Sequence, residues 1–155
     1  MNFSTIADDR FHALKQSIES YPRLAGYYII NMISIRHLRE NGYTQEAILD
    51  AVIYYFDDDP QKSYPSYRYY EEVPYHEAKI GIIKDLVGGN SIGHTVETMS
   101  PEVAEQYFDA FVDLFDTDRR YYVGLDIHND EYVFWYGILV VDSDKAGILW
   151  IVESD

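Results

Sequence analysis

Two short stretches of the chain hold residue types that are typical of hydrolytic or metal-dependent catalysis. In the first, Gly89, Ser91 and Gly93 match the G-x-S-x-G pattern of a nucleophile elbow, and His94 follows immediately. Such an elbow needs a strand before the serine and a helix after it. Here a helix and a double glycine are expected before Ser91, and an extended segment after it. We therefore expect no catalytic triad at this place.

In the second stretch, Asp126, His128 and Asp130 alternate, so they would share one face of a strand. That arrangement could form a metal site or an acid–base pair. The His-Asn-Asp order is also typical turn chemistry, which favours a hairpin connection. The acidic run Asp57–Asp59 lacks the glycine and the spaced glutamate of a calcium loop. From these motifs we predict that the protein is not an enzyme and that it binds no metal or other cofactor.

The clearest chemical pattern is a row of carboxylates in residues 100–116, SPEVAEQYFDAFVDLFD. At about 100° per residue the acids fall within an arc of roughly 80° on a helix, opposite an apolar side. Like charges four residues apart destabilise a helix by about 0.2–0.5 kcal/mol each, and a solvated face usually mixes both signs. We interpret the row as a docking surface for a cationic partner; the alternative is a plain solvent face of an acidic protein. Its members are Glu102, Glu105, Asp109, Asp113 and Asp116.

A second candidate surface is the tyrosine-rich stretch between residues 54 and 75, which holds seven of the sixteen tyrosines. A tyrosine ring offers a large contact area with few torsions to freeze, and it is common at the centre of interfaces. Acids on both sides of the rings suit a partner that exposes lysine and arginine. The alternative is a loop whose rings cover the edge of a small core. The candidate contacts are Tyr64, Tyr67, Tyr69, Tyr70, Glu71, Glu72, Asp57, Asp58 and Asp59.

The elements expected to position these residues are mainly helices. Apolar spacings of three and four, with cap and proline signals, predict helices over 5–20, 22–41, 44–56, 74–87 and 100–116. The segment 22–41 is apolar almost all round, which indicates a buried central helix. Residues 60–73 are expected to be irregular or loosely extended, and a short strand is expected within 92–98.

The pattern changes after residue 116. Residues 121–128, 131–142 and 147–153 are rich in β-branched and aromatic side chains, and turn residues separate them. They predict a three-stranded antiparallel meander. The expected fold is a single α+β domain over 1–155, with about five helices in 5–116 followed by the C-terminal sheet in 121–153.

Composition limits the classes of partner. The chain has 155 residues, with 27 acidic against 12 basic side chains and a net charge of −15. That sign disfavours nucleic acid and anionic membranes, although residues 36–52 resemble a helix-turn-helix in outline. Cysteine is absent, which excludes disulfides and thiolate chemistry. No signal-peptide pattern and no apolar run of about 20 residues is present, so a cytoplasmic protein is expected.

In size, acidity and the two faces built by 102–116 and 64–75, the chain resembles bacterial immunity proteins of contact-dependent inhibition and polymorphic toxin systems. The resemblance implies a protein that binds and neutralises a cognate basic toxin. That toxin would be a nuclease, whose cationic active-site surface the immunity protein occludes. Two alternatives stay open. One is a DNA mimic that inhibits a nucleic-acid-processing enzyme, and the other is a small hydrolase or metal-dependent enzyme.

Overall fold

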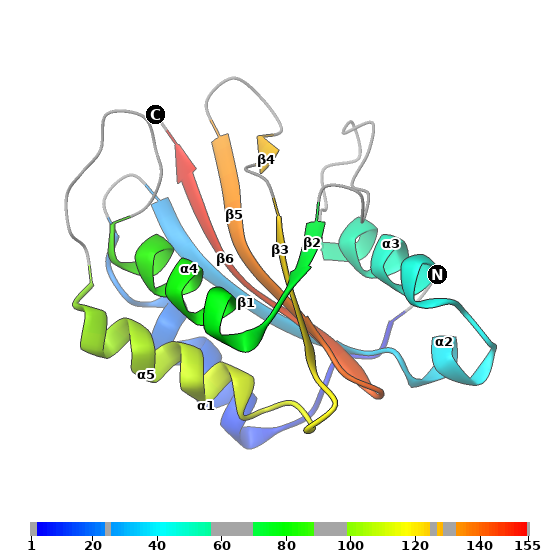
Figure 1. Cartoon of the computed structure of the whole chain (residues 1–155). Helices are drawn as coiled ribbons and strands as arrows, with labels where there is room; N and C mark the ends of the chain where they lie inside the picture. Colours follow the sequence, from blue (N-terminus) through cyan, green and yellow to red (C-terminus); the bar gives the residue numbers. More distant parts are fainter. Residues whose placement is uncertain are drawn as a thin grey trace.

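The computed structural model describes residues 3–23, 26–56, 70–88, 99–124, 127–128 and 133–154. Within them helices pack on an antiparallel sheet, which confirms the predicted α+β class (Figure 1). The helices are α1 (Asp9–Glu19), α2 (Arg36–Glu40), α3 (Gln45–Phe56), α4 (Tyr75–Val87) and α5 (Pro101–Val112). The strands are β1 (Gly26–Ser34), β2 (Tyr70–Val73), β3 (Arg120–Gly124), β4 (Ile127–His128), β5 (Val133–Val141) and β6 (Lys145–Ser154).

The sheet is built around the β5–β6 hairpin. Five strands follow one another in the order β1-β6-β5-β3-β2, and the short β4 pairs with β5 beyond the end of β3. All of these pairings are antiparallel. The two outermost strands of the order, β1 and β2, come from the part of the chain that the sequence pattern assigns to helices and irregular structure.

The predicted arrangement, five helices followed by a three-stranded C-terminal meander, is therefore wrong. The segment predicted as a buried helix over 22–41 forms β1 and the short α2 instead. Residues 70–73, predicted to be irregular, form β2 and pair with β3. The C-terminal strands do pair with their neighbours, but β1 and β2 extend them into one larger sheet.

The misassigned segment is a strand whose two faces are both covered. Tyr28, Ile30 and Met32 point into one hydrophobic core, and Ile33 points into the other. A strand covered on both sides is a nearly continuous apolar run, which periodicity alone does not distinguish from a buried helix. The β-branched and aromatic residues of GYYIINMIS are the feature that favours the strand.

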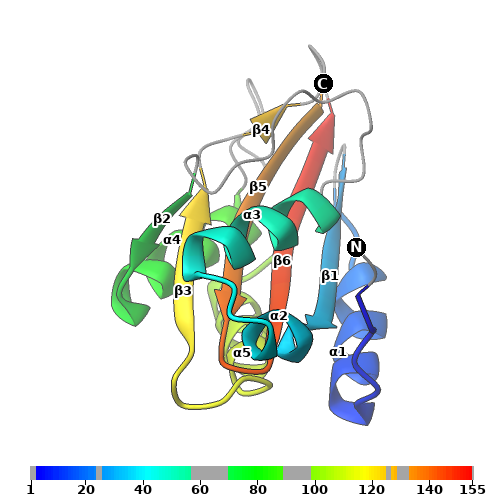
Figure 2. The ribbon, with the colours of Figure 1, turned by 90° about the vertical axis from the view of Figure 1, so that its right-hand side faces the viewer.

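The molecule has three layers, with helices on both faces of the sheet (Figures 1 and 2). Helices α1, α4 and α5 cover one face, where Ile18, Ile82 and Phe108 join the inward side chains of the sheet. Helices α2 and α3 cover the other face, where Leu38 and Ile53 pack against a second set of strand residues. The sheet thus keeps the surfaces of α5 and α3 apart.

Local signals explain where the helices begin. The Asp8 carboxylate caps α1 by accepting from the backbone N–H groups of Arg10 and Phe11. Ser100 caps α5 in the same way, and Pro101 occupies its first turn as the sequence predicts.

In the parts of the chain that the structure describes, none of these helices combines the length and hydrophobicity needed to cross a bilayer.

The outer edge of β1 is covered by side chains of α1. Lys15 Nζ donates to the Ile30 carbonyl at 2.8 Å, and a Glu19 carboxylate oxygen accepts from the Ile30 N–H at 3.0 Å. Lys15 and Glu19 also pair with each other. Further along, the Ser34 N–H donates to the Ser4 carbonyl. These bonds occupy backbone groups that an open sheet edge would present to another chain.

A buried ion pair joins the start of β1 to the end of the chain. The side chains of Arg23 and Glu153 are only 1% and 4% exposed, and they form a salt bridge. The Arg23 guanidinium also donates to the Tyr28 and Tyr136 hydroxyls and to the Leu86 carbonyl at the end of α4. Tyr136 donates in turn to Glu153. One guanidinium therefore connects β1, β5, β6 and α4.

We expect Glu153→Gln to lower the free energy of unfolding by about 3–5 kcal/mol, because it leaves the buried Arg23 charge without its counterion. Urea denaturation followed by circular dichroism measures the change. The exposed Glu102→Gln is the matched control and should stay within about 0.5 kcal/mol of the parent. A similar small change in Glu153→Gln would show that the ion pair does not stabilise the fold.

Candidate partner-binding surface

The acidic row is built on the outer side of α5. Glu102 and Glu105 are exposed, Asp109 is half-buried, and Ala104, Phe108 and Phe111 of the same helix are buried in the core. The helix ends at Val112, earlier than predicted, so Asp113 is its C-cap residue and Asp116 lies beyond it. The row thus lies on the outer side of α5 from Glu102 to the half-buried Asp109 and continues as two exposed carboxylates past the helix end.

A lysine from the neighbouring helix lies against the middle of the row. Lys79 Nζ of α4 is 3.0 Å from a Glu105 carboxylate oxygen and 3.4 Å from an Asp109 oxygen. It also lies 5.7 Å from the centre of the Tyr75 ring. The hydrogen bond that Lys79 donates to the Glu105 carboxylate raises the pKa of Lys79 above its usual value. The structure therefore partly neutralises a row that in sequence contains no basic residue.

Tyr75 belongs to the same cluster. Its hydroxyl donates to Asp109 at 3.3 Å, and its ring packs against Phe108 and Tyr121 while staying 40% exposed. Tyr75, Glu105 and Asp109 surround the Lys79 ammonium with one aromatic ring and two carboxylates. We call these four residues the α4–α5 cage. The ammonium that occupies it belongs to the protein itself.

The ends of the row differ from its middle. Among the residues that the structure describes, Glu102 and Asp113 form no ion pair. Asp116 lies 3.9 Å from Lys145 Nζ. The accessible negative charge of α5 is therefore greatest on both sides of the cage, while the cage holds a cation of its own.

Asp116, Asp118 and Asp142 approach one another closely enough to suggest a metal site. Asp142 is buried, and its oxygens already accept from the backbone N–H groups of Asp116, Asp144 and Lys145 at 2.7–2.8 Å. The Lys145 ammonium lies 2.9 Å from Asp142 and supplies the positive charge that a metal would bring. We interpret the cluster as a structural hydrogen-bond network that connects the β5–β6 turn to the segment after α5.

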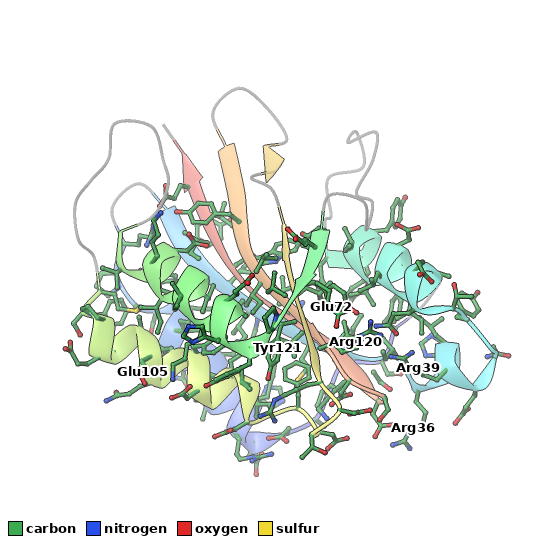
Figure 3. All side chains as sticks on the ribbon, viewed as in Figure 1. Arg36, Arg39, Glu72, Glu105, Arg120 and Tyr121 are labelled. Atoms are coloured by element: carbon green, nitrogen blue, oxygen red, sulfur yellow. The ribbon has the colours of Figure 1, made fainter. Side chains whose placement is uncertain are left out.

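The second predicted surface is described only in part. Asp57, Asp58, Asp59, Tyr64, Tyr67 and Tyr69 lie outside the described residues. Tyr70 is half-buried in β2, with its ring close to Gly124. Glu71 and Glu72 are exposed on β2, and Glu72 forms a salt bridge with Arg120 of β3 (Figure 3). Two further tyrosines, Tyr54 and Tyr55 at the end of α3, are exposed.

The acidic row and the helix that precedes the tyrosine-rich stretch lie on different faces of the sheet. Helix α5 lies on one face, and α3 lies on the other (Figure 2). Tyr75 is the tyrosine of that stretch that contacts the acidic row among the described residues. Within the described residues, carboxylates of the acidic row and a phenol ring therefore meet on the α4–α5 side.

Sequence reasoning did not identify Lys79 as part of the site. Tyr75 and Lys79 are four residues apart on the predicted helix 74–87, so they share a face. Nothing in the spacing states that this face packs beside α5. One signal could have suggested that α4 packs beside α5. Tyr75 and Lys79 are four residues apart on one helix, Glu105 and Asp109 are four apart on the other, and the two pairs have complementary chemistry.

The discounted motifs give no alternative site in the described structure. Ser91, His94, Asp126 and Asp130 lie outside the described residues, and His128 falls in β4. In the helix-turn-helix outline, Arg36 pairs with Asp144, and Arg39 donates to Gln45 and to the Asp142 carbonyl. These arginines, labelled in Figure 3, therefore have hydrogen-bond partners within the protein.

Comparison of the chain with protein-family models, with characterised proteins and with solved structures gave no match. The site is therefore interpreted from its own residues.

We expect Asp142→Asn to lower the free energy of unfolding by about 2–3 kcal/mol, because it weakens a charge-assisted network. Burial raises the pKa of Asp142, but hydrogen bonds from Lys145 and from three backbone N–H groups outweigh it and lower the pKa overall. The carboxylate then stabilises the fold above the unfolded-state pKa, and this stabilisation is lost as the pH falls through the lower folded value.

Urea denaturation at a series of pH values tests this expectation. The difference between the parent protein and Asp142→Asn should be constant from about pH 5 to 8 and should shrink below about pH 4. Asp144→Asn, which removes a more exposed carboxylate of the same turn, is the control and should cost less than about 1 kcal/mol. A pH-independent difference would contradict the role given to the charge.

Proposed function

We propose that this protein binds and masks a basic protein partner through the acidic face of α5, in the manner of an immunity protein that neutralises a toxin. The observation that supports this proposal is the row of carboxylates from Glu102 to Asp113. It runs beside the exposed Tyr75 ring, and among the described residues Lys79 is the one cation paired with it. The partner is a protein whose working surface is rich in lysine and arginine.

Electrostatics favours this type of partner. The chain carries a net charge of −15, so a cationic surface is attracted before contact. Local carboxylates then determine the orientation in which the two surfaces meet. Enzymes that act on nucleic acid have cationic active sites because their substrate is a polyanion. A nuclease toxin therefore fits both the charge and the proposed inhibitory role.

Tyr75 is proposed as the central contact of the interface. Phe108 and Tyr121 hold its ring on one side, so little conformational freedom is lost when a partner packs against the exposed part. A ring that is fixed by the core and surrounded by carboxylates matches the aliphatic stem and charged end of a lysine or arginine side chain. Glu102 and Asp113 would meet further basic residues at the rim.

The first test is protection of growing cells. The protein encoded immediately upstream is the partner to examine, because the proposal places the two genes side by side. Cells that produce its C-terminal domain should stop growing, and co-production of this chain should restore growth. Asp109→Lys together with Asp113→Lys should abolish protection and weaken binding about 30-fold or more, about 2 kcal/mol, as measured by calorimetry.

A matched variant separates this surface from overall charge. Glu40→Lys with Glu46→Lys makes the same change in net charge on exposed positions at the other face of the sheet. It should keep protection and lose less than about fivefold in affinity. Equal losses in the two variants would attribute binding to net charge alone. Unchanged binding in Asp109→Lys/Asp113→Lys would remove α5 from the interface.

Lys79→Met gives an opposite expectation. It removes the cation from the α4–α5 cage, so association with a basic partner should become about two- to tenfold faster at low salt. Stopped-flow association at about 20 and 150 mM salt measures the change, which should diminish at the higher concentration. Slower association would contradict this expectation and would mean that Lys79 is needed to keep Glu105 and Asp109 in the arrangement that binds the partner.

A further inference from the structure

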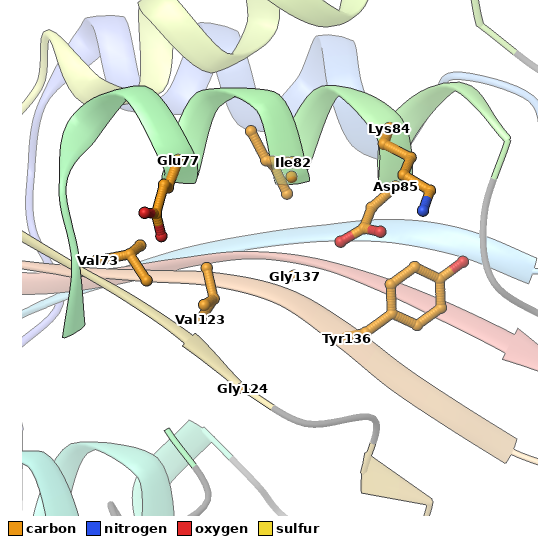
Figure 4. A pocket seen from close by; sticks show the side chains of 10 residues that line it. Val73, Glu77, Ile82, Lys84, Asp85, Val123, Gly124, Tyr136 and Gly137 are labelled. Atoms are coloured by element: carbon orange, nitrogen blue, oxygen red, sulfur yellow. The ribbon is translucent and has the colours of Figure 1, made fainter. Parts of the chain in front are cut away.

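A cavity of about 260 Å³ lies between α4 and the sheet (Figure 4). Its α4 side is formed by Glu77, Gly81 and Asp85, and strands β2, β3 and β5 supply the opposite side. The volume is close to the lower end of ligand pockets in proteins and suits a molecule of a few heavy atoms. Tyr75 and Lys79 follow a different row of α4, so the cavity is separate from the α4–α5 cage.

Gly81 keeps the helix side of this cavity open. Gly81 lies in the middle of α4, where glycine is less favourable than alanine by up to about 1 kcal/mol. A Cβ atom at this position would meet no atom within 4 Å, so packing does not require glycine among the described residues. On the sheet side, the backbone of Gly124 and Gly137 also lines the cavity, but glycine at these positions is explained by the close Tyr70 ring and Leu149 carbonyl. Space for a ligand is a physical reason for an otherwise unfavourable helical glycine.

The helix places one carboxylate towards each end of the cavity. Glu77 and Asp85 are eight residues apart, about 12 Å along the helix axis, and Gly81 lies between them. Figure 4 shows both carboxylates on the side of α4 that faces the sheet. Glu77 forms no ion pair within the described part of the chain. It is therefore the carboxylate available to a ligand.

The remaining lining is mostly apolar. Val73 and Val123 form the part nearest Glu77, Ile82 lies on α4 between Glu77 and Asp85, and the Tyr136 ring lies towards the Asp85 end (Figure 4). The Tyr136 hydroxyl is engaged with Arg23 and Glu153, which fixes the ring. Lys84 also lines the cavity, and the side chains of Glu77 and Lys84 are exposed to solvent at its rim. The Glu77 carboxylate beside Val73 and Val123 matches a single cation with a short apolar chain.

We propose that this cavity binds a short aliphatic amine, with the ammonium at Glu77 and the alkyl chain over Val73 and Val123. The same alkylammonium could belong to a free small molecule or to a lysine side chain of a bound protein. This inference does not rest on the proposed function, because the partner-binding surface and the cavity use different residues of α4.

The test is a titration of the ¹⁵N-labelled protein with n-pentylamine, followed by the amide resonances of Gly81, Gly124 and Gly137. We expect saturable shifts at these amides, and at least about fivefold weaker binding of 1-pentanol and pentanoate, which have a similar shape without the positive charge. A capped Gly-Lys-Gly peptide is the second arm. Tighter binding of the peptide assigns the site to a protein lysine, and tighter binding of pentylamine assigns it to a free amine.

Two variants complete the test. Gly81→Leu fills the cavity and should abolish the shifts, and the milder Gly81→Ala should weaken binding if the leucine variant does not fold. Glu77→Gln should weaken pentylamine at least about fivefold and leave 1-pentanol unchanged. Ala110→Leu on α5 and Glu40→Gln on α2 are the matched controls and should bind as the parent does. Shifts that do not saturate, or equal binding by Gly81→Leu, would overturn the proposal.

Discussion

The buried Arg23–Glu153 pair is the interaction on which the arrangement of the sheet most depends. It lies where the chain enters β1 and where β6 ends, so it connects the N-terminal and C-terminal strands that pair along their whole length. Two buried charges lose hydration when the protein folds, and only close pairing with further hydrogen bonds compensates. Tyr28, Tyr136 and the Leu86 carbonyl provide those bonds. The pair therefore also sets the position of α4, and through α4 the cage and the cavity.

The sequence predicts most helices and the C-terminal strands but not the way they assemble. The cap at Ser100, the first-turn proline and the strand-forming composition after residue 116 are local signals, and the structure contains the elements that they predict. β1 was missed because helices cover both of its faces, which removes the alternation that marks a strand. β2 is four residues long and its pairing with β3 is non-local, so no local pattern indicates it.

The candidate surface shows the same division between local and non-local information. Helical periodicity predicts that Glu105 and Asp109 share an exposed face, and they do. The cation beside them comes from α4, on a segment separated by more than twenty residues, and only the packing of the two helices brings it there. The sequence of α5 alone therefore predicts which carboxylates lie in the row. The net charge of the row also depends on Lys79 of α4.

The covered edge of β1 has a consequence for assembly. Lys15, Glu19 and the segment around Ser4 occupy backbone groups along that side of the sheet. Strand-by-strand growth into a fibre needs two available sides on every copy of the molecule. With one side blocked, two copies that met through their remaining edges would close as a pair and could not polymerise. The α1 side chains thus protect a strand-rich protein from fibrillar aggregation.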